Sequence, residues 1–548
     1  MKPSYQTALA FVASAAAGLA LRTRDLFFVD GAPRCLSVYK HPALLFHPNN
    51  HLLYLVDVFG WTQFVSRLGF SLNTPLKFVL AVDAMNCLAA AGCMAILFWI
   101  LLRVTDSSKL SATVCVGYGL TMSFLAQAVN PNEPMVGFFW SFLAVAFAIL
   151  SLKGLRYWPL VMSGFLFALA MATYRSMVLF APAAAVIVVS RVNEKRISPT
   201  KHCARLAVLA SAFVVGCIAI FGWAYTQMGV SRSGMLAQFL RQEDASAYFD
   251  PSSNQLLKLP LGLVRNCFPV VMNYNGMRGF LASPKSILIP TTLLVFAVWL
   301  AWFYCVYVVI KQRKSWNPAE RMAVLAGLTG LAFTLVPLLT WNPHYGKFWL
   351  QPLACMAVLV AVAYRRFAAE SKRTSTFARI AGVLFLVGVS CNLAWALRNR
   401  SHDPFEFEEA RKVTAYVGDK DLVILDRGAD SVSVMYAYLW ADDNQLLPVM
   451  EEATVKRRAM LREVEESIRR TKERGGKVFF LSVLDFPKPT WDAFLYKRCD
   501  VPYESFDKYR AASHVVARFQ SRPGVTPLFE LDLSAQEMDL AKSAAQTH

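Results

Sequence analysis

The sequence lacks the cysteine and histidine patterns that would indicate a metal centre or a disulfide framework. Its eleven cysteines are scattered, mostly within apolar runs, where a thiol acts as a small hydrophobic side chain. Its eight histidines contain no HExxH motif, because Pro48, and not a glutamate, follows His47 in the run from His47 to His51, and no glycine-rich phosphate loop is present. We therefore expect no bound metal and no required cofactor; a divalent metal is compatible with the sequence but not indicated by it.

Acidic residues are also scarce. The chain has 37 Asp and Glu against 56 Lys and Arg, a net charge of +19, which in a soluble protein would suggest a nucleic-acid partner. Its apolar content of 56% and mean hydropathy of +0.39 point instead to a membrane. Apolar runs of 17 to 25 residues recur between residues 5 and 396. Each is long enough to cross a hydrocarbon core of about 30 Å as a helix.

We therefore predict a polytopic α-helical membrane protein with about 11 transmembrane helices and no nucleic-acid partner. The predicted spans are 5–21, 75–102, 111–129, 135–152, 157–173, 176–190, 206–228, 285–310, 320–341, 346–364 and 379–396. The short connections on one side are 103–109, 153–156, 191–205, 311–321 and 365–379. They hold 18 Lys or Arg and four acids, so the positive-inside rule makes that side cytoplasmic. This orientation places the protein in the cytoplasmic (inner) membrane, with its amino terminus inside and its carboxyl terminus outside.

Two domains are expected. Residues 1–397 form the transmembrane domain, with large outer loops at 22–74 and 229–284, and residues 398–548 form an extracytoplasmic α/β domain without assigned catalysis. Within the second domain, 421–426, 477–484, 513–519 and 528–533 are predicted strands and 451–472 is a predicted amphipathic helix. Residues 1–21 are either a start-transfer helix or a cleaved signal sequence, and in both cases the first loop faces outward.

The first outer loop carries the clearest candidates for catalytic residues. Asp30 lies a few residues outside the first span, with Asp25 as a rival carboxylate, and His47 and His51 follow in an aromatic, hairpin-like run. A carboxylate so placed can take a proton from a substrate hydroxyl. The alternative is an exposed Asp30 paired with a neighbouring arginine, with the histidines bonded to the loop backbone.

A second acid and a cation belong to the outer ends of later spans. Glu133 lies in the turn Asn130-Pro131-Asn132-Glu133-Pro134, which we expect at the outer membrane surface; the alternative is a solvated turn carboxylate. Arg175 lies between the short spans 157–173 and 176–190. Short, interrupted helices are typical of segments that line a cavity. An arginine there is a functional candidate unless it extends to lipid phosphate.

The turn before residue 350 offers a third group. It places His344, Tyr345 and Lys347 at the start of a helix, where backbone N–H groups and the helix dipole attract anions. The alternative is an interfacial aromatic belt with a lysine that reaches the lipid headgroups.

Together these motifs resemble one known family. Asp30 followed by His47-Pro48-Asn49-Asn50-His51-Leu52-Leu53-Tyr54 is similar to the first outer loop of GT-C glycosyltransferases that use polyprenyl-phosphate sugars, the group that includes protein O-mannosyltransferases and aminoarabinose transferases. The Asn-Glu turn and the HYGKFWLQPL segment resemble that family's second acidic turn and its later loop. The resemblance covers roughly residues 5–396. Many members carry a second acidic residue in the first loop, shortly after the first one. In this sequence Gly31 to Arg34 occupy those positions, so a metal-binding role for the loop has no support.

The resemblance implies a GT-C fold and an inverting transfer of sugar from a polyprenyl-phosphate donor to a glycan, lipid or protein acceptor on the extracytoplasmic face. Asp30 would be the general base, and Glu133 the second catalytic acid. Arg175, His344 and Lys347 would stabilise the departing phosphate. The runner-up hypothesis is a transporter or flippase of a lipid-linked saccharide, against which the halves of the chain show no self-similarity. A non-catalytic membrane scaffold is the third.

Overall fold

A computed structural model describes most of the chain. The described residues are 3–24, 31–40, 52–153, 156–190, 198–231, 234–235, 253–268, 284–340, 345–368, 372–401, 404–425, 430–440, 446–448, 457–492, 501–521 and 524–532. They form two compact units. The first comprises Met1–Val38 and Ala43–His402, and the second Tyr39–Pro42 and Asp403–His548.

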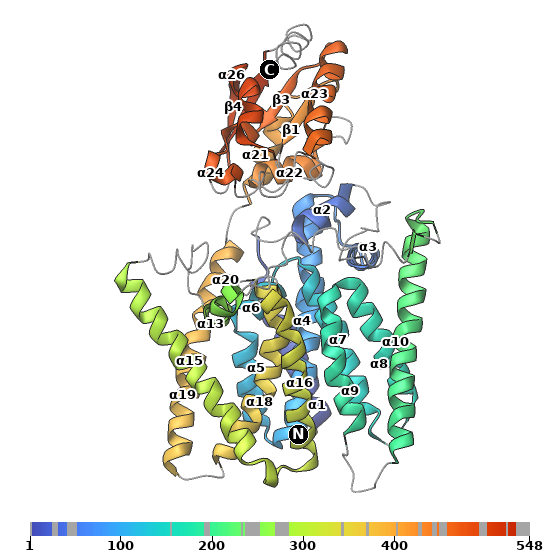
Figure 1. The fold of residues 1–548 in the computed structure, drawn as a ribbon, viewed down its shortest axis with the longest axis vertical. Coiled ribbons are helices and arrows are strands. Elements are labelled where there is room, and N and C mark those ends of the chain that lie inside the picture. The colour runs from blue at the N-terminus through green and yellow to red at the C-terminus, as the bar shows by residue number, and fades with distance from the viewer. Residues whose placement is uncertain are drawn as a thin grey trace. The chain divides into compact units, whose positions relative to one another are not determined.

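The first unit is helical throughout its described part (Figure 1). Its elements are α1 (Pro3–Leu21), α2 (Gly31–Lys40), α3 (Tyr54–Arg67), α4 (Pro75–Thr105), α5 (Ser108–Gly119), α6 (Met122–Ala128), α7 (Glu133–Leu150), α8 (Trp158–Thr173), η2 (Arg175–Phe180), α9 (Ala181–Val189), α10 (Pro199–Gln227), α13 (Ser253–Cys267), α15 (Lys285–Lys311), η3 (Arg313–Ser315), α16 (Pro318–Thr334), α17 (Val336–Thr340), η4 (Gly346–Trp349), α18 (Leu350–Ala368), α19 (Lys372–Ser390) and α20 (Asn392–Ser401).

Eight helical stretches among the described residues are long and apolar enough to span a membrane, or nine if one bent pair counts as a span. The count of eleven is therefore not confirmed, and the difference has a physical reason. The bent pair is α5 and α6, which meet at 74°, whereas α8 and the η2–α9 segment are shorter apolar helices. The sequence had predicted that 157–173 and 176–190 are unusually short, and the structure confirms this.

Close helix packing depends on glycines. A Cβ at Gly164 of α8 would lie 2.5 Å from the Leu209 carbonyl oxygen of α10, and a Cβ at Gly330 of α16 would lie 2.8 Å from Cys355 Sγ of α18. These positions let the backbones approach, as small residues do between membrane helices, where apolar burial alone gives little drive for association.

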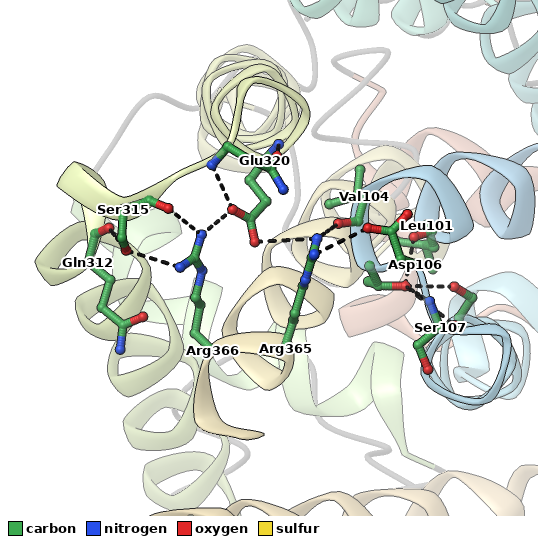
Figure 2. A network of polar contacts seen from close by, with 12 residues as sticks. Leu101, Val104, Asp106, Ser107, Gln312, Ser315, Glu320, Arg365 and Arg366 are labelled. Carbon is green, nitrogen blue, oxygen red and sulfur yellow. Dashed lines mark hydrogen bonds and ion pairs between the residues drawn. The ribbon is translucent and has the colours of Figure 1, made fainter. Parts of the chain in front are cut away.

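A polar network joins the amino-terminal end of α16 to the carboxyl-terminal ends of α18 and α4 (Figure 2). The fully buried Glu320 caps the amino terminus of α16 by accepting from the Asn317 N–H at 3.0 Å, and it forms ion pairs with Arg366 and Arg365. Arg365 also reaches Asp106 at 3.2 Å, after the end of α4. Two of the basic residues predicted to set the membrane orientation therefore also hold three helices together.

The second unit contains α21 (Glu406–Val413), α22 (Ser431–Leu439), α23 (Arg457–Glu473), η7 (Val483–Asp485), α24 (Lys488–Trp491), η9 (Tyr503–Phe506), α26 (Asp507–Ala511) and five strands. The strands β1 (Leu422–Leu425), β2 (Leu446–Pro448), β3 (Val478–Leu481), β4 (Ser513–Gln520) and β5 (Val525–Leu531) form one sheet in the order β2-β1-β3-β5-β4. β1 pairs in parallel with β2 and β3, whereas β5 is antiparallel to β3 and β4. Val464 and Ile468 of α23 are buried in its core, which confirms the predicted helix face.

Two predictions about the outer loops need correction. The run after His51 is not hairpin-like, because Tyr54–Arg67 forms the helix α3. Leu52 and Leu53 are buried against α8 and α10, so this segment packs as part of the first unit. In the predicted outer loop 229–284, residues Ser253–Cys267 form the helix α13, whose Leu263 and Val264 are fully buried.

Candidate active site

The short helices α8 and η2 are separated by a one-residue break at Tyr174. Its backbone is extended, with φ −153° and ψ 107°, while α8 ends at Thr173 and η2 begins at Arg175. The break that the sequence predicted at this point is confirmed. The Tyr174 side chain is buried, so the break lies within protein. Interrupted backbone at such a place is characteristic of helices that surround a site.

Three further elements meet this break. The Thr173 hydroxyl donates to Asp57 Oδ2 of α3 at 3.4 Å. A Cβ at Gly137 of α7 would lie 2.9 Å from Tyr174 Cβ, so α7 passes directly against the break. Lys347 Nζ of η4 lies 6.0 Å from the centre of the Tyr174 ring. Segments far apart in sequence therefore converge on one point.

The two predicted phosphate-binding cations belong to this convergence. Arg175 is half-buried and interacts electrostatically with the Tyr225 hydroxyl of α10. Lys347, also half-buried, lies 5.6 Å from the Tyr345 ring and 6.0 Å from the Phe348 ring, in addition to Tyr174. Aromatic faces attract an ammonium group and fix its position. Arg175 directly follows Tyr174 in the chain and Lys347 lies near the Tyr174 ring, so both cations belong to the segments that meet at the break.

The η4 turn is anchored from two sides. The Ser123 hydroxyl of α6 donates to the Gly346 carbonyl oxygen at 2.5 Å, and the Gln351 side chain donates to the Met177 carbonyl oxygen of η2 at 3.0 Å. These bonds tie the lysine-bearing turn to the segment that begins with Arg175. Tyr345, the other predicted binding residue on the turn, is 43% exposed.

Glu133 lies at the start of α7 and is fully buried. The alternative of a solvated turn carboxylate is therefore wrong, whereas the expected position at the outer membrane surface stays a prediction. The reason is Asn86 of α4, whose side-chain amide donates to the carbonyl oxygens of Asn130 at 2.6 Å and of Asn132 at 2.7 Å. The turn thereby satisfies its backbone against another helix and can be buried. Glu133 and Gly137 are four residues apart, so Glu133 lies on the face of α7 that meets the break.

Sequence reasoning missed a buried polar group next to Glu133. Tyr54 of α3 is fully buried, and its hydroxyl lies 3.5 Å from Cys35 Sγ. Burial raises the pKa of Tyr54 well above its usual value, and Cys35 and the Glu133 and Asp83 carboxyls act in the same direction. Tyr54 therefore stays a neutral hydroxyl that can donate a hydrogen bond to a carboxylate.

Asp83 of α4 was missed as well. It is fully buried, neither of its carboxylate oxygens has a hydrogen-bond partner among the described residues, and its nearest opposite charge is Arg22 at the end of α1. The available signal was the occurrence of Asp83 and Asn86 three residues apart within an apolar span, since polar residues at membrane depth are costly and usually functional.

From the sequence, Asp57 of α3 is only one more acidic residue of the predicted first outer loop, with no role assigned to it. In the structure burial raises its pKa to about 7, and the hydrogen bond from Thr173 opposes this only in part. A carboxyl that titrates near neutral pH beside the break is chemically suited to proton transfer.

The pKa of Asp57 leads to a stability prediction. A folded-state pKa of about 7, against about 4 in the unfolded chain, means that Asp57 lowers the stability of the fold progressively as pH rises from about 4 to about 7. Asp57→Asn should therefore gain in thermal stability relative to the wild type as pH increases over that range and keep a constant advantage above it. Thermal unfolding of both proteins at pH 5, 6, 7 and 8 measures this.

The control for that series is Asp106→Asn, which removes a carboxylate whose side chain is 74% exposed. Its difference from the wild type should not change with pH. If the difference in thermal stability between Asp57→Asn and the wild type is also constant from pH 5 to pH 8, the Asp57 carboxyl is ionised over the whole range and the prediction is wrong.

Five predicted site residues, Asp25, Asp30, His47, His51 and His344, lie outside the described residues. Among the residues that the structure does describe, no group of three or more His, Cys, Asp or Glu side chains is arranged to hold a metal ion.

The apolar helices define a multi-spanning membrane protein, and the fold of the whole chain is found among solved structures. The crystal structure of ArnT from Cupriavidus metallidurans bound to undecaprenyl phosphate is similar to this chain with a TM-score of 0.55 at 11% identity, over 95% of this chain and 97% of that chain. The apo structure of the same protein is similar with a TM-score of 0.53 at 10% identity, over 97% and 99%. No family model and no curated protein matches the sequence. The GT-C resemblance inferred from the sequence is thus confirmed for the fold.

Proposed function

We propose that this protein is an inverting membrane glycosyltransferase that moves a sugar from a polyprenyl-phosphate donor to a glycan, lipid or protein acceptor of the cell envelope. The observation that carries the proposal is the meeting of three segments at one break: Lys347 lies near the Tyr174 ring, Arg175 directly follows Tyr174, and α7, which begins with the buried Glu133, passes against Tyr174. Two cations and a carboxylate on segments that meet in this way match the charges of a departing phosphate and a reacting hydroxyl. The fold shared with ArnT, which was solved with undecaprenyl phosphate, supports the same class of donor.

In the proposed reaction the acceptor hydroxyl attacks the anomeric carbon of the donor sugar from the face opposite the phosphate. A new carbon–oxygen bond forms, the bond from the anomeric carbon to the phosphate oxygen breaks, and polyprenyl phosphate leaves with the bonding electrons. Asp30 takes the proton of the acceptor hydroxyl. Arg175, Lys347 and the predicted His344 bind the phosphate, whose negative charge increases as the bond breaks.

Glu133 has a different proposed role from Asp30. It is fully buried and interacts with Tyr54, so it orients the catalytic loop and the sugar from the interior side. Tyr345, His47, His51 and Asp25 are proposed to contact donor or acceptor at the outer rim. The remaining proposals concern placement. The chain resides in the inner membrane, its amino terminus is cytoplasmic, and residues 398–548 form an extracytoplasmic domain.

The function is tested by comparing envelope glycans, lipids and proteins from cells with and without the gene by mass spectrometry. Loss of one sugar modification, restored by the wild-type gene, is the expected result. A flippase would also change the envelope, so the second measurement uses the purified chain in liposomes with the donor lipids of the same cells. An enzyme releases free polyprenyl phosphate when acceptor is added. Movement of the intact donor across the bilayer without release would establish the flippase instead.

A further inference from the structure

An apolar cavity of about 90 Å³ lies between α4, α7, α9, α16 and α18. A single water needs about 10–15 Å³ on this measure, so the space could hold several. All of its lining residues except Arg103 are apolar, and Leu97, Phe142 and Ala323 are typical of them. Water in such a space would lack hydrogen-bond partners, whereas a hydrocarbon chain would lose nothing by entering it.

The cavity is elongated along the helices. On α16 its lining runs from Ala319 to Gly327, which at the rise of an α-helix corresponds to about 12 Å. One leaflet of the hydrocarbon core is about 15 Å deep. A chain that starts at the headgroups of one leaflet would therefore fill the cavity without leaving that leaflet. The deep end reaches Phe180, the last residue of η2.

The other end of the cavity carries positive potential. Arg103 is exposed there, with its guanidinium carbon 4.1 Å from the Trp99 ring centre, and no carboxylate among the described residues forms an ion pair with it. Ala319 belongs to the first turn of α16, where the helix dipole adds partial positive charge; Pro318 has no N–H, and the Glu320 N–H is already bonded to Asn317 Oδ1. The neighbouring Glu320 is compensated by two arginines, as Figure 2 shows, so it does not cancel this potential.

We propose that this cavity binds one acyl chain of an anionic phospholipid, with the lipid phosphate between Arg103 and the amino terminus of α16. The charge at the mouth selects an anionic headgroup, and the apolar lining selects a chain. This end of the bundle holds the basic connections, so the lipid comes from the leaflet that those connections face. The bound chain packs against Phe180 and thereby supports the η2 segment that begins with Arg175. The site does not depend on sugar transfer.

Native mass spectrometry of the full chain in detergent, with phosphatidylglycerol or phosphatidylcholine added, tests the proposal. We expect one phosphatidylglycerol to be retained and phosphatidylcholine to be lost at the same activation. Arg103→Gln should weaken phosphatidylglycerol binding by roughly fivefold, as one basic residue at a lipid surface does. Ala323→Met should abolish retention because it fills the cavity. Arg321→Gln and Ala332→Met change exposed residues of the same helix and should bind as the wild type does.

Equal retention of both lipids, or unchanged binding by Arg103→Gln, would overturn the proposal. Arg103 is an exposed side chain, so that variant folds even if Ala323→Met does not. Undecaprenyl phosphate is the third ligand offered. If it displaces phosphatidylglycerol and its binding is lost in Ala323→Met, the cavity belongs to the tail of the sugar donor and the phospholipid proposal is wrong. Loss of transfer activity with lipid binding intact would concern the proposed function alone.

Discussion

Asp30→Asn should lower the rate of sugar transfer by about 10²–10⁴-fold, the usual contribution of a general base. Asparagine keeps the size of the side chain but cannot take the proton from the acceptor hydroxyl. Donor binding should be retained, because the cations proposed to bind the phosphate belong to other segments. The measurement is the initial rate of product formation in liposomes, together with the binding of undecaprenyl phosphate to the same preparation.

The matched control is Asp25→Asn, which removes the rival carboxylate of the same loop. It should leave the rate within a few-fold of the wild type. If Asp25→Asn is inactive while Asp30→Asn is active, Asp25 is the base. If both variants transfer sugar at wild-type rates, the first loop does not supply the base, and the buried Glu133 and Asp57 become the candidates.

The second large effect is expected at the phosphate. Lys347→Gln should reduce transfer by about 10²–10³-fold, comparable to removal of one preorganised donor from a developing negative charge. Lys347 is held near three aromatic rings, Tyr174, Tyr345 and Phe348, so its ammonium group is positioned before the donor binds. The decrease should appear mainly in kcat, because the charge on the phosphate oxygen is greater in the transition state than in the bound donor.

Lys285→Gln is the control for this variant, since Lys285 is an exposed lysine at the start of α15. It should transfer sugar at the wild-type rate. Lys347→Arg keeps the charge and should recover part of the activity. A decrease in Lys347→Gln that appears only in KM, or none at all, would show that the lysine does not act on the leaving phosphate.

Local patterns in the sequence were sufficient for the membrane class and for the break at Tyr174. Apolar run lengths decide whether a helix can span, and the polar residues Thr173 to Ser176 interrupt two such runs visibly. The burial of Glu133 was not predictable in this way. It depends on Asn86, which is distant in the chain and donates to two turn carbonyl groups at 2.6 and 2.7 Å. The sequence shows a turn, but not the helix that covers it.

The same limit applies to Tyr54 and Asp57. Both are polar residues of the predicted first outer loop, yet each lies against another helix of the first unit. β2 was missed for a different reason, because a three-residue strand is too short for an alternating pattern. The helix α3 was misread because its aromatic residues also suit a strand.

The brevity of α8 affects the bilayer around it. Its 16 residues extend for only about 24 Å, against a hydrocarbon core of about 30 Å. Val161, Met162 and Phe165 on this helix are exposed, so lipid tails cover it directly. Local thinning of the bilayer beside α8 is one way to match so short a helix. The headgroup plane would then come closer to Arg175, which follows the end of α8, and a lipid-borne phosphate in that leaflet would reach the depth of the break without leaving its own layer.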